Sequence, residues 1–324
     1  KMSSMSFNTT SIVVGATAFA LSIIGLSLLR KKEEKVKAPR VSNLIIYPIK
    51  SCKGIYVDTA EIAETGFLYD RIFVLVDEKN LFLTQRKLPR MALIDVRISV
   101  ASNCLIINAP DMPECKIPLQ YPESEATIER IKIWGDDCDT INAANHEVNE
   151  WFSKFLGVRG VRILRMHKRF IRKTDPNYAP TGQTAFSDGY PFLIMSEASL
   201  QEINKTLPTP VTVDNFRPNI VVTGCDAFAE DKWKEINFVV GKEKINMKVV
   251  KPCARCTMPN VDPKIGVMDS DHAVTKALKT FRTGEKLQFP NPKWRKELFV
   301  GQNIDHAGRA GGKLSVGTQL EIVQ

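Results

Sequence analysis

Two cysteines three residues apart form the pattern in this sequence that is best suited to chemistry. Cys253 and Cys256 lie in the segment KPCARC, which spans residues 251–256. A structural zinc site is one interpretation, but the other five cysteines are isolated and no two histidines have the spacing of metal ligands. A redox dithiol is a second interpretation, although such a pair belongs at the start of a helix and the prolines on both sides favour a loop.

A single metal-binding thiolate is the third interpretation of the same segment. Lys251 and Arg255 place positive charge near Cys256, and positive charge favours the ionised form of a thiol. A soft thiolate suits a second- or third-row metal or a sulfur-rich cofactor. The chemistry of the segment therefore leaves structural thiols, a redox pair and metal ligation all open.

Two other segments carry groups suited to an anion. Arg217 lies between two asparagines in the segment NFRPN, and its guanidinium suits a phosphate or a polar heterocycle. Lys50, Ser51 and Lys53 follow an apolar stretch within the segment YPIKSCKG, in a turn that offers donors to an anion. Each segment equally fits a solvated turn, so neither identifies a ligand by itself.

Charged residues elsewhere in the sequence are weaker candidates for a functional site. Asp70 and Arg71 lie between apolar residues of a strand or at its start, where an ionised pair needs a reason to be present. The basic run of four Lys and Arg residues between positions 168 and 173 is more typical of a solvated face or a partner surface than of a catalytic group.

The elements that must position these residues are mainly strands. Short apolar stretches broken by turn residues predict strands at 44–47, 72–76, 81–83, 105–107, 161–164, 192–195, 220–222, 238–240, 248–250 and within 312–323. Residues 77–80 would form a hairpin loop between the second and third of these strands.

Helices are few. The spacing of apolar residues over 148–156 predicts an amphipathic helix that ends near Gly157. A second helix, capped by Ser196 or Ser199, and a third near residues 273–280 are also expected.

A polar stretch interrupts the strands, and no internal repeat is visible. Residues 168–190 contain two prolines and two glycines and predict a long connector or an active-site loop. The fold class indicated by the whole pattern is mainly β with some α (α+β), in a barrel-like architecture.

The first 40 residues have the pattern of a membrane anchor and a basic flank. The apolar run 11–29 would span roughly 28 Å as a helix, about one hydrocarbon core. Residues 30–40 carry six basic and two acidic groups, which by the positive-inside rule keep the following residues in the cytosol. A secretory signal peptide is the alternative, but its charge would precede a shorter apolar run.

Charge and cysteine content exclude several classes of function. Lys1 contributes +1 and residues 30–40 a net +4 of the formal charge of +9, which leaves +4 for residues 41–324. That remainder, without a basic stripe among aromatics, argues against nucleic acid. Seven cysteines at low density predict reduced thiols instead of a disulfide framework. Phosphate-binding and dinucleotide motifs, a GxSxG elbow and iron–sulfur spacing are all absent.

Several of these segments, taken in order, resemble a known family. YPIKSCKG, the Asp70–Arg71 pair, SDGYPF, NFRPNI and PCARC follow one another as in MOSC-domain proteins of the amidoxime-reducing type, and the tail GKLSVGTQLEIV resembles the end of their barrel. The anchor also fits the mitochondrial members of this family in animals. The resemblance implies an anchor and flank at 1–40, an N-terminal MOSC-associated β domain at 41–165 and a MOSC β-barrel domain at 166–324.

The resemblance also implies a molybdenum cofactor (Mo-molybdopterin) with a pterin dithiolene and a terminal phosphate. Cys256 would be the thiolate ligand of molybdenum, and Asp188 would handle a proton near the metal. Gly189 and Tyr190 stand where relatives have small hydroxyl residues, so backbone N–H groups are the donors left there. The cofactor-binding residues implied by the resemblance are Lys50, Ser51, Arg71, Gly189, Tyr190, Arg217, Asn219, Ala254, Arg255 and Cys256.

The activity that the resemblance implies is reduction of amidoximes, hydroxylamines and N-oxides by oxygen-atom removal at molybdenum. No ferredoxin-like segment follows the barrel, so a separate electron carrier is expected, and the resemblance implies supply from NADH through cytochrome b5 reductase and cytochrome b5. The anchor suits the mitochondrial outer membrane, with the endoplasmic reticulum as the alternative. The alternative functions are a MOSC sulfur carrier or molybdenum cofactor sulfurase-type protein, and a non-catalytic tethered β protein with structural cysteines.

Overall fold

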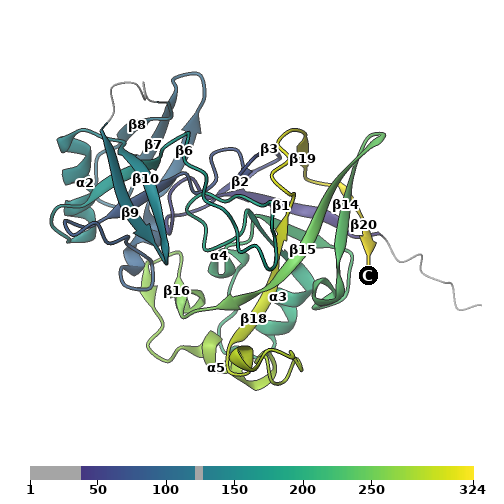
Figure 1. Cartoon of the computed structure of the whole chain (residues 1–324). Coiled ribbons are helices and arrows are strands. Elements are labelled where there is room, and N and C mark those ends of the chain that lie inside the picture. The colour runs from purple at the N-terminus through teal and green to yellow at the C-terminus, as the bar shows by residue number, and fades with distance from the viewer. Residues whose placement is uncertain (1–37, 121–126) are drawn as a thin grey trace, which may run out of the picture. The chain divides into compact units, whose positions relative to one another are not determined.

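The computed structural model describes residues 38–120 and 127–324, and the anchor predicted at 11–29 lies outside these ranges. Strands make up most of the regular structure, and helices are few (Figure 1). Within the described ranges, no helix is both long and apolar enough to cross a bilayer. The predicted mainly β, barrel-like architecture is confirmed.

Seven strands close into a barrel, in which each strand pairs with the next and the last pairs with the first. All neighbours are antiparallel except β12 and β13, which run parallel. Figure 1 shows the long strand β15 crossing the barrel wall beside β14 and β18. In ring order the strands are β1 (Arg40–Ile46), β13 (Ile220–Thr223), β12 (Phe192–Ser196), β18 (Leu298–Asp305), β15 (Glu243–Arg255), β14 (Glu235–Val240) and β20 (Gln319–Val323).

Strand β1 closes this ring although it comes from the other end of the described chain. Its residues Arg40 to Leu44 pair with β13, and Arg40 also pairs with Gln319 of β20. Apolar side chains of the barrel strands fill the interior and are almost fully buried, among them Leu44, Ile194, Ile220, Ile236, Phe238, Ile304 and Leu320. The strand pairing therefore joins the two halves of the chain, and the domain boundary at 165/166 stays a prediction.

Smaller sheets lie outside the ring. A four-stranded sheet has the order β5 (Phe73–Val76), β11 (Arg162–Met166), β10 (Asp136–Asn142) and β9 (Ile128–Ile133). A three-stranded sheet contains β6 (Asp95–Ser99), β7 (Cys104–Asn108) and β8 (Cys115–Pro118). The remaining short strands are β2 (Ile55–Val57), β3 (Thr59–Ala63), β4 (Gly66–Phe67), β16 (Val261–Asp262), β17 (Val267–Met268) and β19 (Lys313–Ser315).

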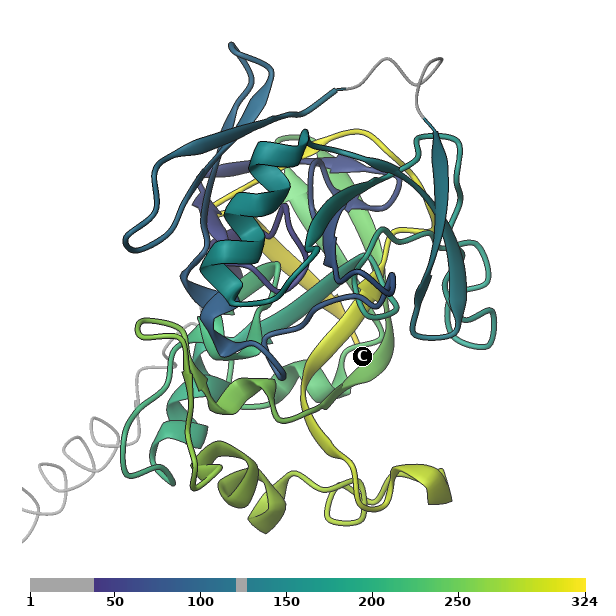
Figure 2. The same cartoon turned by 90° about the vertical axis from the view of Figure 1, so that its left-hand side faces the viewer.

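Helix α2 (His146–Leu156) confirms the clearest helix prediction. The side chain of Asn145 accepts a hydrogen bond from the backbone N–H of Val148, and Gly157 ends the helix in the left-handed conformation. The apolar face, with Trp151 and Phe152, packs in a core shared with both smaller sheets. Figure 2 shows α2 facing the viewer between them.

The other helices are short. Ser196 caps α3 (Glu197–Asn204) by accepting from the backbone N–H of Ser199, as one of the two predicted caps. Helix α5 (Ala273–Phe281) matches the third prediction. The remaining helical segments are α4 (Val213–Phe216) and the 3₁₀ turns η1 (Pro89–Leu93), η2 (Ala229–Lys232), η3 (Met258–Asn260) and η4 (Pro292–Trp294).

Two sequence predictions about local structure were wrong. Residues 81–83 form only isolated bridges, because Asp77 accepts backbone N–H groups of residues 79 and 81 and bends the chain tightly. Residues 251–255 are not a loop but the end of β15, despite Pro252. The pairing of β15 with β18 shifts register on both sides of this proline, and such bulges leave room for a residue without an N–H donor.

Glycine 301 is required where β18 passes close to β12. It has a φ of +72°, and a Cβ there would lie 2.7 Å from the carbonyl oxygen of Ile194. We expect Gly301→Ala to lower the free energy of unfolding by about 3 kcal/mol, because strain and a backbone clash add. Gly241→Ala is the control, since Gly241 has a φ of +62° but open space around it. Gly241→Ala should lower the free energy of unfolding by about 1 kcal/mol. Equal losses of unfolding free energy for the two variants in urea denaturation would contradict the predicted clash.

Candidate active site

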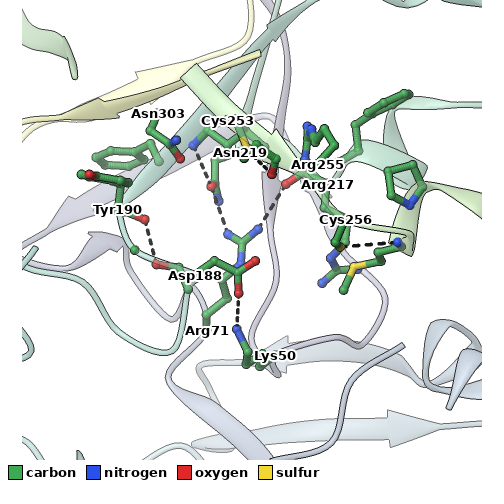
Figure 3. A pocket seen from close by; sticks show the side chains of 18 of the residues that line it. Lys50, Arg71, Asp188, Tyr190, Arg217, Asn219, Cys253, Arg255, Cys256 and Asn303 are labelled. Carbon is green, nitrogen blue, oxygen red and sulfur yellow. Dashed lines mark hydrogen bonds and ion pairs between the residues drawn. The ribbon is translucent and has the colours of Figure 1, made fainter. Parts of the chain in front are cut away.

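One cavity brings together all the residues that the sequence analysis selected for a cofactor. They come from the turn after β1, the segment after β4, the loop 184–190, the segment after α4 and the end of β15. Figure 3 shows several of these side chains directed toward one another. The selected residues that line the cavity are Lys50, Ser51, Arg71, Asp188, Gly189, Tyr190, Arg217, Asn219, Ala254, Arg255 and Cys256. Their roles stay predictions.

The Asp70–Arg71 pair has a structural reason to be buried. Asp70 accepts the backbone N–H of Tyr47 at 2.8 Å and the Nη1 of Arg71 at 2.5 Å. Arg71 has a φ of +52° and reaches across to Asn219 Oδ1 at 3.0 Å and to the carbonyl of Arg217 at 3.1 Å. The Arg71 guanidinium therefore ties the segment after β4 to the segment after α4, and Asp70 ties it to Tyr47 in the turn after β1.

Tyr47 lies under two guanidinium groups. The Cζ atoms of Arg71 and Arg217 are 4.4 Å and 4.2 Å from the centre of its ring, within cation–π distance. Its hydroxyl donates to the carbonyl of Pro218 at 3.1 Å, and burial raises the pKa of Tyr47 above its usual range. Tyr47 thus supports both positive charges as a neutral ring.

Among the residues that line this cavity, two buried guanidinium nitrogens have no hydrogen-bond partner in the described part of the chain. They are the Nη2 atoms of Arg217 and Arg255. Arg217 ends α4 in the left-handed conformation, and burial together with the charge of Arg71 lowers its pKa. Arg255 uses its other nitrogens on the carbonyls of Val300 and Phe216 at 3.0 and 2.9 Å. Buried, unpartnered donors of this kind call for an anionic ligand.

The two cysteines of the KPCARC segment differ in environment. Cys256 is exposed at the end of β15, and the backbone N–H of Met258 points to its Sγ at 3.5 Å. Burial raises the pKa of the Cys253 thiol, which favours its protonated form. Among the residues that the structure describes, no cluster of three His, Cys, Asp or Glu side chains could hold a metal. Cys256 is therefore the thiol of this pair that is more accessible to a ligand.

Asp188 is held at the edge of the cavity by one of its two carboxylate oxygens. Its Oδ1 accepts from Lys50 Nζ at 2.6 Å and from Trp134 Nε1 at 3.2 Å. Lys50, Trp134 and Arg71 together hold the pKa of Asp188 well below its usual range. Asp188 is therefore an ionised acceptor at neutral pH.

Arg172 holds the loop that carries Asp188, and sequence reasoning missed it. It was expected within a solvated basic run, yet its side chain is only 3% exposed. Its Nη1 donates to the carbonyls of Ala185 and Ser187 at 2.9 and 2.6 Å, and its Nε pairs with Asp136 at 2.8 Å. The prediction was wrong for Arg172 because charge composition does not reveal which carbonyls a folded loop leaves without donors.

The two residues after Asp188 contribute open volume and a backbone carbonyl to this part of the cavity. A Cβ added to Gly189 would meet no atom within 4 Å, so this residue leaves open volume beside the carboxylate. The carbonyl of Tyr190 accepts from Ser187 Oγ at 2.7 Å. The hydroxyl of Tyr190 is buried without a partner in the described residues, and burial raises its pKa.

Some lining residues had no signal in the sequence. Asn303 donates to the carbonyl of Lys251 at 3.1 Å, and Ser187 Oγ donates to the carbonyl of Tyr190 within the same loop. Both line the cavity together with Phe192 and Leu193. Asn303 and Leu193 lie in strands whose sequence patterns predict only structure, whereas Ser187 and Phe192 belong to the SDGYPF segment but were given no role of their own.

Comparison with known proteins matches both halves of the chain to family models. Residues 38–159 match the MOSC N-terminal beta barrel domain and residues 181–320 match the MOSC domain. Human "Mitochondrial amidoxime reducing component 2" is 35% identical over 284 residues, covering 83% of this chain and 82% of the relative. Mouse "Mitochondrial amidoxime-reducing component 1" is 31% identical, covering 83% and 81%.

We expect Arg172→Met to release the loop 184–190. The substitution keeps side-chain length but removes the donors to two carbonyls, so the free energy of unfolding should fall by about 2 kcal/mol. The neighbouring Lys173 is exposed, and Lys173→Met should change the free energy of unfolding by less than about 0.5 kcal/mol. Chemical denaturation of both variants measures the difference; similar values would show that Arg172 does not hold the loop.

Proposed function

This chain belongs to the MOSC-domain family of amidoxime-reducing components, and we propose that it is a molybdenum-cofactor-dependent reductase of N-oxygenated compounds. The observation that carries the proposal is the meeting of one exposed thiol, Cys256, with the unpartnered nitrogens of Arg217 and Arg255 in one cavity. A soft metal ligand and anion-binding donors are the two features that a metal dithiolene with a phosphate requires.

The residues present fit this group. Cys256 would hold the metal, since it is exposed and receives an N–H from Met258. Lys50, Ser51 and Arg71 would hold the pterin and phosphate from one side, and Arg217, Asn219, Ala254 and Arg255 from the other. When bound, the cofactor supplies the two-electron chemistry by which an oxygen atom is removed from nitrogen.

The chain's own residues would orient the substrate and manage protons. The Oδ2 atom of Asp188 accepts no hydrogen bond within the described ranges, and the side chain is 73% exposed. It can therefore accept an N–H or O–H of an amidoxime or a hydroxylamine. The ammonium of Lys50, which donates to Asp188 and to the carbonyl of Phe186 at 2.8 Å, keeps that carboxylate ionised and ready to accept a hydrogen bond.

Location and electron supply follow from the relatives and from the predicted anchor. The matched relatives are named mitochondrial, and the apolar run 11–29 precedes a basic flank. We propose an N-terminal anchor in the mitochondrial outer membrane with residues 38–324 in the cytosol. Cytochrome b5 and its NADH-dependent reductase are the proposed electron donors.

Reduction of benzamidoxime tests the proposal. The full chain, purified with stoichiometric molybdenum and pterin, should convert benzamidoxime to benzamidine when NADH, cytochrome b5 reductase and cytochrome b5 are added. Protein without molybdenum and pterin would contradict both cofactor-based functions. Cofactor-loaded protein that does not reduce benzamidoxime would favour the sulfur-carrier or sulfurase-type alternative.

The two cysteines should respond unequally to substitution. We expect Cys256→Ser to lower benzamidoxime reduction by more than about 100-fold, because it removes the proposed metal ligand. Cys253→Ser should keep activity within about threefold, since that thiol is only partly exposed and its contact with the carbonyl of Ala254 is long. Steady-state rates normalised to molybdenum content measure both; equal losses would indicate a functional dithiol.

Arg217→Met should separate cofactor binding from folding. Without an anion the buried guanidinium is unfavourable, so the melting temperature of cofactor-free protein should stay the same or rise. The pterin content of protein purified from cells should fall by about tenfold or more, because a buried charged donor is lost. Arg97→Met, which removes an exposed arginine paired with Glu114, is the control and should alter neither value. Unchanged pterin content in Arg217→Met would contradict the proposed phosphate contact.

A further inference from the structure

One aromatic side chain reaches the cavity edge from the turn between β9 and β10. Trp134 lies in this turn with a φ of +57°. Bulky residues rarely adopt this left-handed conformation, and the neighbouring Gly135, for which it would cost least, lies outside that region. A backbone outlier that its surroundings maintain suggests that the side chain has a specific task.

The indole of Trp134 contacts the carboxylate that the substrate would meet. Its Nε1 donates to Asp188 Oδ1 at 3.2 Å, on the same oxygen that Lys50 approaches at 2.6 Å. Two donors on one oxygen restrict rotation of the carboxylate. They leave Oδ2 open to the cavity, with no acceptor role toward any residue that the structure describes.

Neighbouring side chains hold the indole in this orientation. The ring of Phe82 meets it edge to face at 5.1 Å, and the guanidinium of Arg86 lies 4.8 Å from its centre. Lys50 Nζ is 5.8 Å from the same ring. Trp134 nevertheless stays 46% exposed, so burial in a core does not explain its presence.

The same turn contacts the Asp188 loop a second time. Asp136, the first residue of β10, pairs with Arg172, which donates to the carbonyls of Ala185 and Ser187. The turn thus fixes the loop backbone through Arg172 and the loop carboxylate through Trp134. Two independent contacts make the β9–β10 turn part of the apparatus that orients Asp188.

We propose that Trp134 is a positioning residue that presents Asp188 Oδ2 to the N–H groups of an amidine-type substrate or product. The inference rests on the proposed reductase function, because it takes that reaction's substrate class as the ligand. Its basis is the indole hydrogen bond beside a carboxylate oxygen that is left free. An amidine is protonated at neutral pH and offers N–H donors on both nitrogens, whereas an amide is neutral and offers a carbonyl in one of these places, so the oriented carboxylate distinguishes the two.

Calorimetric titration of the cofactor-loaded full chain with benzamidine and benzamide tests this inference. Wild-type protein should bind benzamidine more tightly than benzamide. Trp134→Phe keeps an aromatic ring but removes the N–H, and should reduce that preference about tenfold. Asp188→Asn should abolish the preference. A purely structural role would weaken both ligands alike.

Trp294→Phe is the matched control. Trp294 is also half-buried and packs against Tyr178 and Phe299, outside the cavity lining, so its substitution should leave the preference unchanged. The inference is overturned if wild-type protein shows no preference for benzamidine, or if Trp134→Phe retains the full preference. Benzamidoxime turnover by wild-type protein, measured in parallel, reports separately on the proposed reductase function.

Discussion

Positive charge buried around one tyrosine is the constraint on which the candidate site depends. Arg71 and Arg217 both lie over Tyr47, and among the described residues Asp70 is the one carboxylate that forms an ion pair with either of them, namely with Arg71. Two guanidinium groups in a desolvated space repel each other, and Arg217 retains a donor without a partner in the described chain. The fold therefore holds an arrangement that an anion would stabilise, which is the sign of a binding site and not of a core.

Closure of the barrel by β1 explains how this arrangement is assembled. Lys50 and Arg71 follow β1 and β4, whereas Arg217 and Arg255 belong to segments some 150 to 200 residues later. Because β1 pairs with β13 and β20, the turn after β1 is carried to the segment after α4, where Arg71 bonds to Asn219. Neither half of the chain contains the complete set of donors.

Local rules predicted elements well, whereas side-chain environments could not be predicted. The 148–156 periodicity and Gly157 were sufficient for α2, because amphipathic spacing and a left-handed cap are local signals. The segment 251–255 was mistaken for a loop, since bulges that accommodate Pro252 depend on β18. Arg172 and Trp134 were not selected because their partners come from another segment of the chain. Arg172 donates to carbonyls of the loop 184–190, and Trp134 donates to the carboxylate of the same loop. The resemblance selected residues that the fold brings together, but no residue pattern alone indicated this.

The cavity has two chemically distinct ends, and this difference determines what it can orient. One end carries the donors of Arg217 and Arg255, suited to an anion. The other carries the ionised carboxylate of Asp188, which lies beside open space at Gly189. In the proposed function, an anionic group of the cofactor would lie at the first end and an N–H donor of the substrate at the second. Since Cys256 lines the same cavity, the bound anion and the reacting nitrogen would each face the protein group of complementary charge.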